Sequence, residues 1–360
     1  MRSFESHTGR TRILFGSGTV HELAAELARL GAQRALILTT PGQAAVAFRI
    51  ADQLGEKCVG LFPEAVMHTP VEVTDRAQAY LEQVGADAVV AVGGGSTTGL
   101  GKALASRRGL PHLVLPTTYA GSEVTPVLGE TAEGEKTTRS SPEIQPDTVI
   151  YDVDLTLTLP WTVSLTSAVN AMAHAVEALY ADTRTDDTDR KATDALTALS
   201  TGLRALHTDR HSVEARSELL YGAWLAGVSL GAVGMGLHHK LCHTLGGSFG
   251  LPHAPTHTVV LPYAMEYNQA AAPSAISAAA AALDVRDGPS GLQHLVRSLD
   301  GPTDLAALGF ANTDIPRAAV LATARPYPNP REVTEDEVSA LLRRATAGTP
   351  ITGDRELSDP

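Results

Sequence analysis

Short apolar runs alternate with segments of helical periodicity along the first 157 residues. The runs lie at 12–15, 34–39, 58–61, 88–92, 113–115 and 147–152. The helical segments between them lie at 19–30, 44–54, 74–84 and 96–107. A strand buried on both faces reads as a continuous apolar run, and helices between such strands cover both faces of a parallel sheet. The pattern predicts an α/β domain with a Rossmann-like parallel sheet over residues 1–157.

The strand pattern stops after residue 157, and apolar residues then recur at helical spacing. Helices are predicted at 163–182, 186–206, 212–231, 236–246, 274–283, 291–299 and 334–347. Helices without strands form a bundle around their shared apolar faces. The sequence therefore predicts a second, all-α domain over residues 158–360.

Composition narrows the class of protein. The 360 residues exceed what one core usually supports, and the apolar fraction of 43% is that of a globular protein. A net charge of -12 argues against nucleic acid and against an anionic membrane as partners. The N-terminus lacks the apolar stretch of a secretion signal, no segment is long enough to span a bilayer, and the two cysteines lie far apart. We expect a cytoplasmic protein.

A glycine loop follows one of the predicted strands. Gly93, Gly94 and Gly95 stand between the apolar run at 88–92 and a predicted helix that begins at Ser96. Glycines let the backbone approach a ligand closely, and the amides of a helix N-terminus bind phosphate. At the carboxyl edge of a parallel sheet, such a loop binds the pyrophosphate of a dinucleotide. The alternative is a tight strand-to-helix turn without a ligand, and the usual G-x-G-x-x-G pattern is absent.

Hydroxyl side chains follow two other strands at the same predicted edge. Those after the run at 113–115 are Thr117, Thr118, Tyr119 and Ser122. Thr39 and Thr40 stand at the end of the run at 34–39, where a carboxylate would accept from a ribose 2′-hydroxyl and repel a 2′-phosphate. Because no acid stands there, we expect the protein to use both NADH and NADPH.

Five of the thirteen histidines fall within residues 238–257. His239 and His243 are four apart in a segment rich in helix formers, so one helical face carries both. Gly246 and Gly247 are expected to end this helix, and His253 then returns from a loop or turn. A single histidine is more often structural than functional. Several in one segment indicate a catalytic site, because imidazole titrates, ligates metals and donates protons near neutral pH.

Asn170 and His174 form a second pair at helical spacing. With His239 and His253 they have the layout of a divalent-metal site, in which two ligands come from one helix, one from another helix and one from a loop. Fe(II) prefers at least one carboxylate, whereas this set holds a neutral amide and three imidazoles. The sequence itself therefore argues against a bound metal.

Together these motifs resemble those of the iron-type alcohol dehydrogenases, from about residue 15 to about residue 347. The similarity is carried by the loop Gly93–Ser96, the segment 116–125, the Asn170/His174 helix and the spacing of His239, His243 and His253. In that family an aspartate and three histidines ligate the metal, at positions that match Asn170, His174, His239 and His253. The resemblance also implies that His243 lies near the nicotinamide.

Two departures from the family pattern are informative. Asn170 stands where the family has aspartate, and Gly99 stands where many members have aspartate. With these features the chain is similar to the maleylacetate reductase branch, which uses NADH or NADPH and works without a metal. The resemblance implies that the protein reduces the carbon–carbon double bond of the dianion 2-maleylacetate to give 3-oxoadipate, and that it forms a homodimer.

The implied chemistry gives the candidate residues their roles. Hydride addition beta to a ketone leaves an enolate, whose oxygen needs hydrogen-bond donors before the alpha carbon is protonated. We expect His243 or His253 to donate the proton, His174 and His239 to donate hydrogen bonds as protonated imidazoles, and Asn170 to orient a partner. Candidate cations for the dianion are Lys240, Arg325 and Arg331. The candidate cofactor contacts are Thr39, Thr40, Gly93, Gly94, Gly95, Ser96, Thr117, Thr118, Tyr119, Ser122 and Lys136.

Three other functions fit parts of the pattern. A metal-dependent alcohol or polyol dehydrogenase of the same fold would use Asn170 as a ligand. A nucleotide-binding regulatory protein would have kept the fold and lost the chemistry, although the retained histidines argue against this. A lyase or cyclase on a similar two-domain scaffold is the third alternative.

Overall fold

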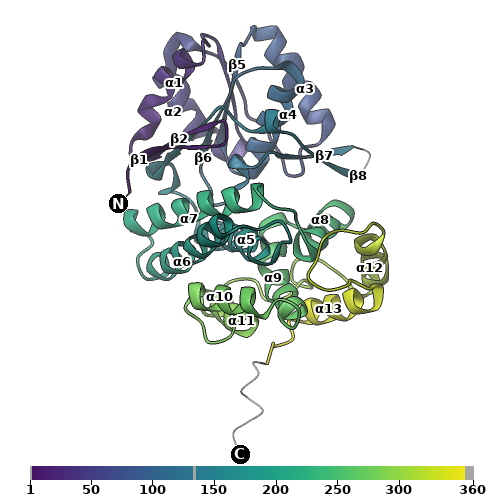
Figure 1. Ribbon diagram of the computed structural model, residues 1–360. Coiled ribbons are helices and arrows are strands. Elements are labelled where there is room, and N and C mark those ends of the chain that lie inside the picture. The colour runs from purple at the N-terminus through teal and green to yellow at the C-terminus, as the bar shows by residue number, and fades with distance from the viewer. Residues whose placement is uncertain (1, 133–134, 353–360) are drawn as a thin grey trace, which may run out of the picture. The chain divides into compact units, whose positions relative to one another are not determined.

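The computed structural model describes residues 2–132 and 135–352, and Figure 1 shows its elements. Contacts group the chain into two compact units. The first comprises Met1–Leu159 with His211–Leu220, and the second comprises Pro160–Arg210 with Tyr221–Pro360. The fold class predicted from the sequence, an α/β part followed by a helical part, is confirmed. The domain limits 1–157 and 158–360 stay a prediction.

A seven-stranded sheet organises the first unit. Its strands are β1 (Phe4–Thr8), β2 (Thr11–Gly16), β3 (Ala35–Leu38), β4 (Cys58–Phe62), β5 (Ala88–Gly93), β6 (His112–Pro116) and β9 (Thr148–Asp152). They lie in the order β1-β2-β9-β6-β5-β3-β4, and all neighbours are parallel except β1 and β2. β1 was not predicted, because its side chains are alternately exposed and only partly buried and it carries no apolar run.

Helices cover both faces of this sheet, as Figure 1 shows. They are α1 (Leu23–Arg29), α2 (Ala44–Leu54), α3 (Val71–Val84) and α4 (Gly95–Arg108). Successive side chains of a strand point to opposite faces. Accordingly Ile37 packs into the core under α1 and α2, whereas Leu36 and Leu38 pack into the core under α3 and α4. The apolar runs are therefore strands buried on both sides.

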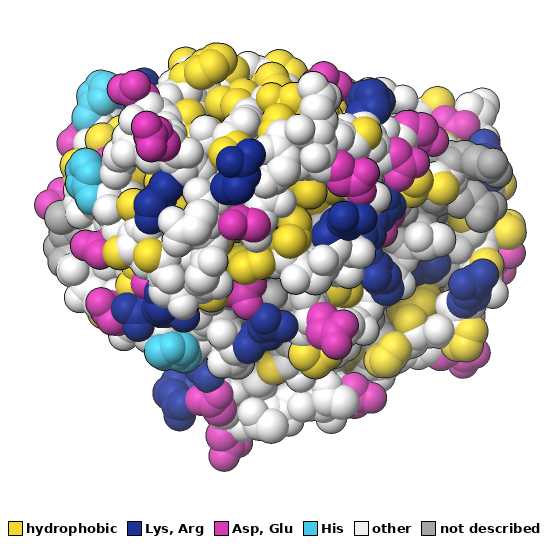
Figure 2. Space-filling view, turned by 90° about the horizontal axis from the view of Figure 1, so that it is seen from above, with side chains coloured by type: hydrophobic (Ala, Val, Ile, Leu, Met, Phe, Trp, Pro, Cys, Tyr) yellow, Lys and Arg dark blue, Asp and Glu magenta, His cyan; other side chains and the backbone are white. Residues whose placement is uncertain are grey.

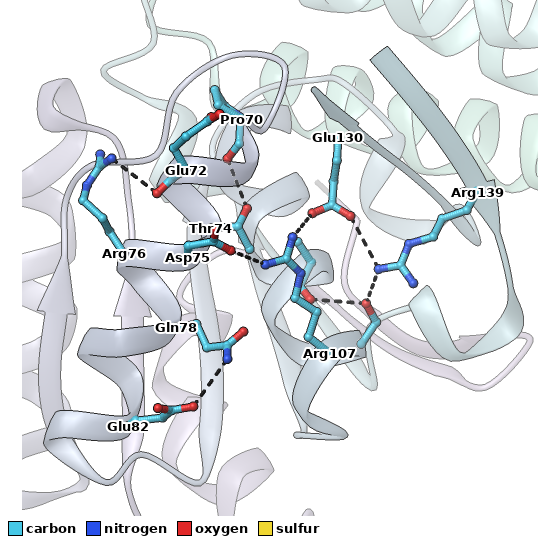
Figure 3. A network of polar contacts seen from close by, with 12 residues as sticks. Pro70, Glu72, Thr74, Asp75, Arg76, Gln78, Glu82, Arg107, Glu130 and Arg139 are labelled. Carbon is cyan, nitrogen blue, oxygen red and sulfur yellow. Dashed lines mark hydrogen bonds and ion pairs between the residues drawn. The ribbon is translucent and has the colours of Figure 1, made fainter. Parts of the chain in front are cut away.

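A two-stranded antiparallel hairpin, β7 (Val127–Ala132) and β8 (Glu135–Ser140), lies beside this sheet. Polar contacts fix it to the helices, as Figure 3 shows. Arg107 of α4 donates to Asp75 of α3 (2.8 Å) and to Glu130 of β7 (2.7 Å). Arg139 of β8 lies 3.6 Å from Glu130. The hairpin was not predicted, because it is held by these charges rather than by an apolar run.

The second unit is helical. Its helices are α5 (Trp161–Tyr180), α6 (Asp186–Thr208), α8 (Leu237–Phe249), α9 (His253–Gln269), α10 (Pro273–Leu283), α11 (Gly288–Ser298), α12 (Ile315–Thr323) and α13 (Glu335–Ala347), while α7 (Val213–Gly231) is shared between the units. α5 is buried from Ser164 to Leu179 and packs against α6, α9 and α10. α9 and α12 were not predicted.

Acidic and basic side chains are interspersed over the face drawn in Figure 2. No helix among the described residues combines the length and hydropathy needed to cross a bilayer.

Candidate active site

The glycine loop connects β5 to α4, as the sequence predicts. A Cβ atom on Gly93 would lie 2.4 Å from Thr97 Oγ1, and one on Gly94 would lie 2.8 Å from Thr118 Oγ1. Both distances are well below van der Waals contact, so these positions require glycine. The amides of Gly95 and Ser96 precede the first bonded amide of the helix, Thr97 N, which donates to Gly94 O (3.1 Å). Amides in this position suit a phosphate.

Several hydroxyls expected to contact the cofactor are used inside the protein instead. Thr39 Oγ1 donates to Val92 O (2.9 Å), Thr117 Oγ1 donates to Gln43 Oε1 (2.8 Å), and the Tyr119 hydroxyl accepts from Arg216 Nη1 (3.1 Å). All three residues are buried. Each hydroxyl can still make a further hydrogen bond, so all three residues stay predicted cofactor contacts.

Other residues predicted to contact the cofactor have hydroxyl groups that can bind a ligand. Thr40, Ser96 and Thr118 are partly exposed. Ser122 Oγ is buried and has no hydrogen-bond partner among the described residues. Lys136 lies on β8, but its side chain falls outside the part of the chain that the structure describes.

A buried lysine holds residues 122–127 against α4, the helix that follows the glycine loop. Lys102 of α4 is 2% exposed. Its Nζ donates to Ser122 O (2.7 Å), Thr125 O (2.8 Å), Thr125 Oγ1 (3.1 Å) and Val127 O (3.0 Å). Burial lowers the pKa of Lys102 to about 7, and the nearby Glu123 carboxylate opposes this shift. Four acceptors around one nitrogen indicate the ammonium form, which holds residues 122–127 against the helix that begins at the glycine loop.

We expect the Lys102→Met variant to bind NADH about tenfold more weakly, which corresponds to about 1.4 kcal/mol. The thioether fills similar space but donates no hydrogen bond, so the carbonyls at 122, 125 and 127 lose their partner and the segment shifts. NADH binding measured by fluorescence quenching checks this. Lys57→Met is a suitable control, because the one hydrogen bond of Lys57 within the described part of the chain is long, 3.4 Å to Ala24 O. An unchanged dissociation constant in Lys102→Met would show that Lys102 does not position this segment.

Six histidines gather in the second unit. They come from α5 (His174), α8 (His238, His239, His243) and α9 (His253, His257). The ring centroids of His174 and His239 lie 5.1 Å apart, those of His239 and His243 6.0 Å apart, and those of His243 and His253 6.4 Å apart. The predicted histidines thus lie together. His253 is the first residue of α9 rather than part of a loop, because α8 continues past Gly246 and Gly247 to Phe249 and ends at Gly250, whose φ is +70°.

A buried carboxylate organises one side of this cluster. Glu177, 1% exposed, accepts hydrogen bonds from Gly236 N (2.9 Å) and His238 N (2.8 Å) at the start of α8. Its Oε2 also lies 2.6 Å from His239 Nδ1. Since a carboxylate only accepts, His239 Nδ1 carries the proton. His239 Nε2 is buried and has no partner among the described residues, so this is the nitrogen that His239 offers to a ligand.

Burial keeps three of the rings neutral. It lowers the pKa of His174, His238 and His257 well below the ordinary histidine value, and neighbouring imidazoles lower each pKa further. A neutral imidazole still donates through one N–H group. The expectation of a protonated His174 is therefore corrected, because in the unliganded protein this ring is a neutral donor.

Two family models of known proteins match this chain, one in each half. A family model for iron-containing alcohol dehydrogenase matches residues 10–153, and one for the C-terminal part of the Fe-containing alcohol dehydrogenase family matches residues 164–346.

The chain belongs to the iron-containing alcohol dehydrogenase family.

Similar proteins within this family carry a more specific name. Maleylacetate reductase 1 of Rhodococcus opacus is 53% identical over 94% of this chain and 94% of its own. Maleylacetate reductase of Rhizobium sp. (strain MTP-10005) is 51% identical over 97% of this chain and 99% of its own. The crystal structure of maleylacetate reductase from Agrobacterium tumefaciens has a TM-score of 0.90 at 49% identity, covering 98% of this chain and 100% of that one.

The metal position inherited from the family fits iron poorly. Asn170, His174, His239 and His253 include no carboxylate, so no negative charge among them offsets the ion. Among the described residues, the one group of histidine, cysteine or acidic side chains with metal-ligand spacing is a different one, formed by His238, Cys242 and His257. The residues at the family position therefore do not suit iron.

Positive charge lies beside the cluster on α8. Burial lowers the pKa of Lys240, and the positive charge of Arg325 lowers it further, which places the two cations near each other. Arg331 is instead paired with Glu337 and stacked on Tyr267, 4.1 Å from the ring centre, in a pocket of about 280 Å³. Of the three candidate cations, Lys240 and Arg325 are thus the pair that suits a dianion, and Arg331 is dropped.

Sequence reasoning gave no role to Glu177, Lys102, His238 or His257. Glu177 stands three residues after His174, so helical spacing places it on the same face. Its partner His239 is 62 positions away, and no local signal pairs them. Lys102 sits in a helix where lysine is ordinarily exposed, so only the tertiary structure shows that it is buried.

Proposed function

We propose that this protein is a maleylacetate reductase, which reduces the carbon–carbon double bond of 2-maleylacetate to give 3-oxoadipate. The observation that carries the proposal is the cluster of imidazoles at the family metal position, where an asparagine replaces the expected carboxylate. Maleylacetate reductases that are 43–53% identical over nearly the full chain support it. We infer that the reaction needs no metal, since this donor set does not suit one.

The first unit supplies the dinucleotide site. Amides at Gly95 and Ser96 suit the pyrophosphate, and the hydroxyls of Thr118 and Ser122 lie at the same loop. When bound, the reduced nicotinamide supplies a hydride.

We expect NADH and NADPH to support turnover with kcat/KM values within about 100-fold of each other. Thr39 and Thr40 offer no carboxylate that would repel a 2′-phosphate. Steady-state kinetics with each cofactor at saturating maleylacetate provide the comparison. A preference for NADH greater than this would contradict the interpretation of Thr39 and Thr40.

The second unit stabilises the charge that develops on the substrate. Hydride adds to the carbon beta to the ketone, the double-bond electrons move to the oxygen, and an enolate forms. We assign to His174 and His239 the role of donating hydrogen bonds to that oxygen. His239 holds one proton on Nδ1 against Glu177, so it donates from Nε2 when it is doubly protonated and paired with the carboxylate. Donors fixed before the reaction lower its barrier more than mobile water does.

A proton then reaches the alpha carbon and restores the ketone. His243 and His253 are both partly exposed, whereas the other histidines of the cluster are buried, so these two can exchange protons with solvent. Either is suited to the role of proton donor. Lys240 and Arg325, which lie near each other, are the cations that we propose for the substrate carboxylates. One hydride and one proton are consumed for each product formed.

An assay of cofactor oxidation tests the function directly. We expect NADH oxidation with maleylacetate to be matched by formation of 3-oxoadipate, and we expect simple aldehydes and alcohols to be poor substrates. Efficient turnover of alcohols or aldehydes, with no reduction of maleylacetate, would instead favour a metal-dependent alcohol dehydrogenase. A cytoplasmic location and a homodimeric assembly remain part of the proposal.

A further inference from the structure

A second group of potential metal ligands lies beside the histidines that the proposed mechanism uses. His238, Cys242 and His257 are all buried, and one ligand atom from each lies within 4.8 Å of the other two. His238 Nε2 lies 2.9 Å from His257 Nδ1 and 3.7 Å from Cys242 Sγ. The mechanism above uses none of these three side chains.

Two of the three distances between these ligand atoms are close to those of a tetrahedral zinc site. With Zn–N of about 2.0–2.1 Å and Zn–S of about 2.3 Å, two nitrogens lie about 3.3 Å apart and a nitrogen and a sulfur about 3.6 Å apart. The two distances to His238 Nε2 differ from these values by a few tenths of an ångström. Small side-chain rotations would therefore admit an ion in place of the proton that the two rings share.

Ligand chemistry distinguishes this group from the inherited family position. A thiol can become a thiolate, which offsets one charge of the ion, whereas an asparagine amide cannot. Two imidazoles and a thiolate favour soft or borderline cations such as Zn²⁺ and Cd²⁺ over Fe²⁺. These three residues therefore suit a thiophilic cation better than the residues around Asn170 do.

We propose that His238, Cys242 and His257 form an inhibitory site for a thiophilic divalent cation such as Zn²⁺ or Cd²⁺. On binding, the Cys242 S–H bond breaks, a metal–sulfur bond forms and one proton is released to solvent. The proton shared by the two rings moves to the outer nitrogen of its own ring, which changes the tautomer. The His257 ring lies 4.3 Å from that of His253 and 5.1 Å from that of His239, so a bound ion places a positive charge beside two rings of the proposed mechanism.

Cadmium titration of metal-free protein tests the site without relying on enzyme activity. We expect the ultraviolet band of a cadmium–thiolate bond to saturate at one ion per chain, in the wild type and in Cys58→Ser. Cys58, on β4, is the other cysteine and serves as the matched control. In Cys242→Ser the band should be absent, and His257→Ala should lose at least about tenfold in affinity. Absence of the band in the wild type, or a band that persists in Cys242→Ser, would overturn the proposal.

Inhibition of turnover provides the second measurement. Zn²⁺ should inhibit NADH oxidation by the wild type, and chelator should reverse the inhibition. The Cys242→Ser variant should need at least about tenfold more Zn²⁺ for the same inhibition while its basal rate is kept. Equal sensitivity of the two proteins would assign the inhibition to another position. Because cadmium binding is measured separately, failure of the proposed reductase activity would not be confused with failure of this site.

Discussion

The Glu177→Gln variant is expected to lose about 100-fold in kcat/KM for maleylacetate, the order of effect seen when one donor to a developing oxyanion is removed. In the wild type, three N–H groups face the carboxylate: Gly236 N, His238 N and His239 Nδ1. A glutamine of the same size turns an NH₂ group toward at least one of them. The variant also loses the negative charge that pairs with a doubly protonated His239.

Stability should fall in the same variant by about 1–3 kcal/mol, because a buried donor is left without an acceptor. Kinetics are therefore measured well below the unfolding temperature, together with NADH binding, which should not change. Glu266→Gln is the matched control, since Glu266 pairs with Arg344 (2.6 Å) away from the cluster. A kcat/KM for Glu177→Gln within about threefold of the wild type would show that His239 does not depend on this carboxylate.

Replacing either histidine of the proposed proton-donor pair should lower turnover strongly. We expect His243→Ala and His253→Ala each to reduce kcat by at least about tenfold, and the true donor by about 100-fold or more, as is usual for a general acid. His253 begins α9, and His243 lies on the face of α8 that also carries His239. The solvent isotope effect on kcat, measured in H₂O and D₂O, identifies the donor. It should increase only in the variant that lacks the donor, because protonation of the alpha carbon becomes rate-limiting there.

His294→Ala is the control for this pair. His294 lies exposed on α11 in the same unit, and its removal should leave the rate unchanged. If both cluster variants retained nearly full kcat, the proton would have to come from water or from another group. The assignment of His243 and His253 would then be withdrawn.

The first unit was largely predictable from the sequence, because its strands are buried on both faces. Residues of β3 and β5 are apolar at nearly every position, and short runs of this kind between helical segments are typical of the inner strands of a parallel sheet. β1 and the β7–β8 hairpin lack that signal. Their side chains are partly exposed, and the hairpin is anchored by Arg107 and Glu130, whose pairing depends on tertiary structure.

The histidine site was predictable in its residues but not in its geometry. Helical spacing correctly grouped His239 with His243 and Asn170 with His174. Helix α9 was missed because Pro255 and Pro262 interrupt the helical pattern, although a proline in the first turn is compatible with a helix. Contacts across long separations, such as His238 with His257, follow only from the packing of α8 on α9.

The hydroxyl side chains near the glycine loop also have contacts that the sequence does not predict. Thr39, Thr117 and Tyr119 follow the strands where a cofactor contact is expected, yet each side chain is already bonded within the protein. Sequence position fixes the edge of the sheet on which a side chain lies. It does not reveal which other group of the protein forms a hydrogen bond with that side chain.

The central claim is that N–H groups of imidazoles, rather than a metal ion, stabilise the enolate oxygen. The most direct measurement is the rate of maleylacetate reduction by one protein preparation before and after exhaustive EDTA treatment, with the metal content determined on the same samples. We expect an unchanged rate at a metal content far below one ion per chain. Loss of activity in EDTA, followed by recovery on addition of Fe²⁺ or Zn²⁺, would contradict the claim.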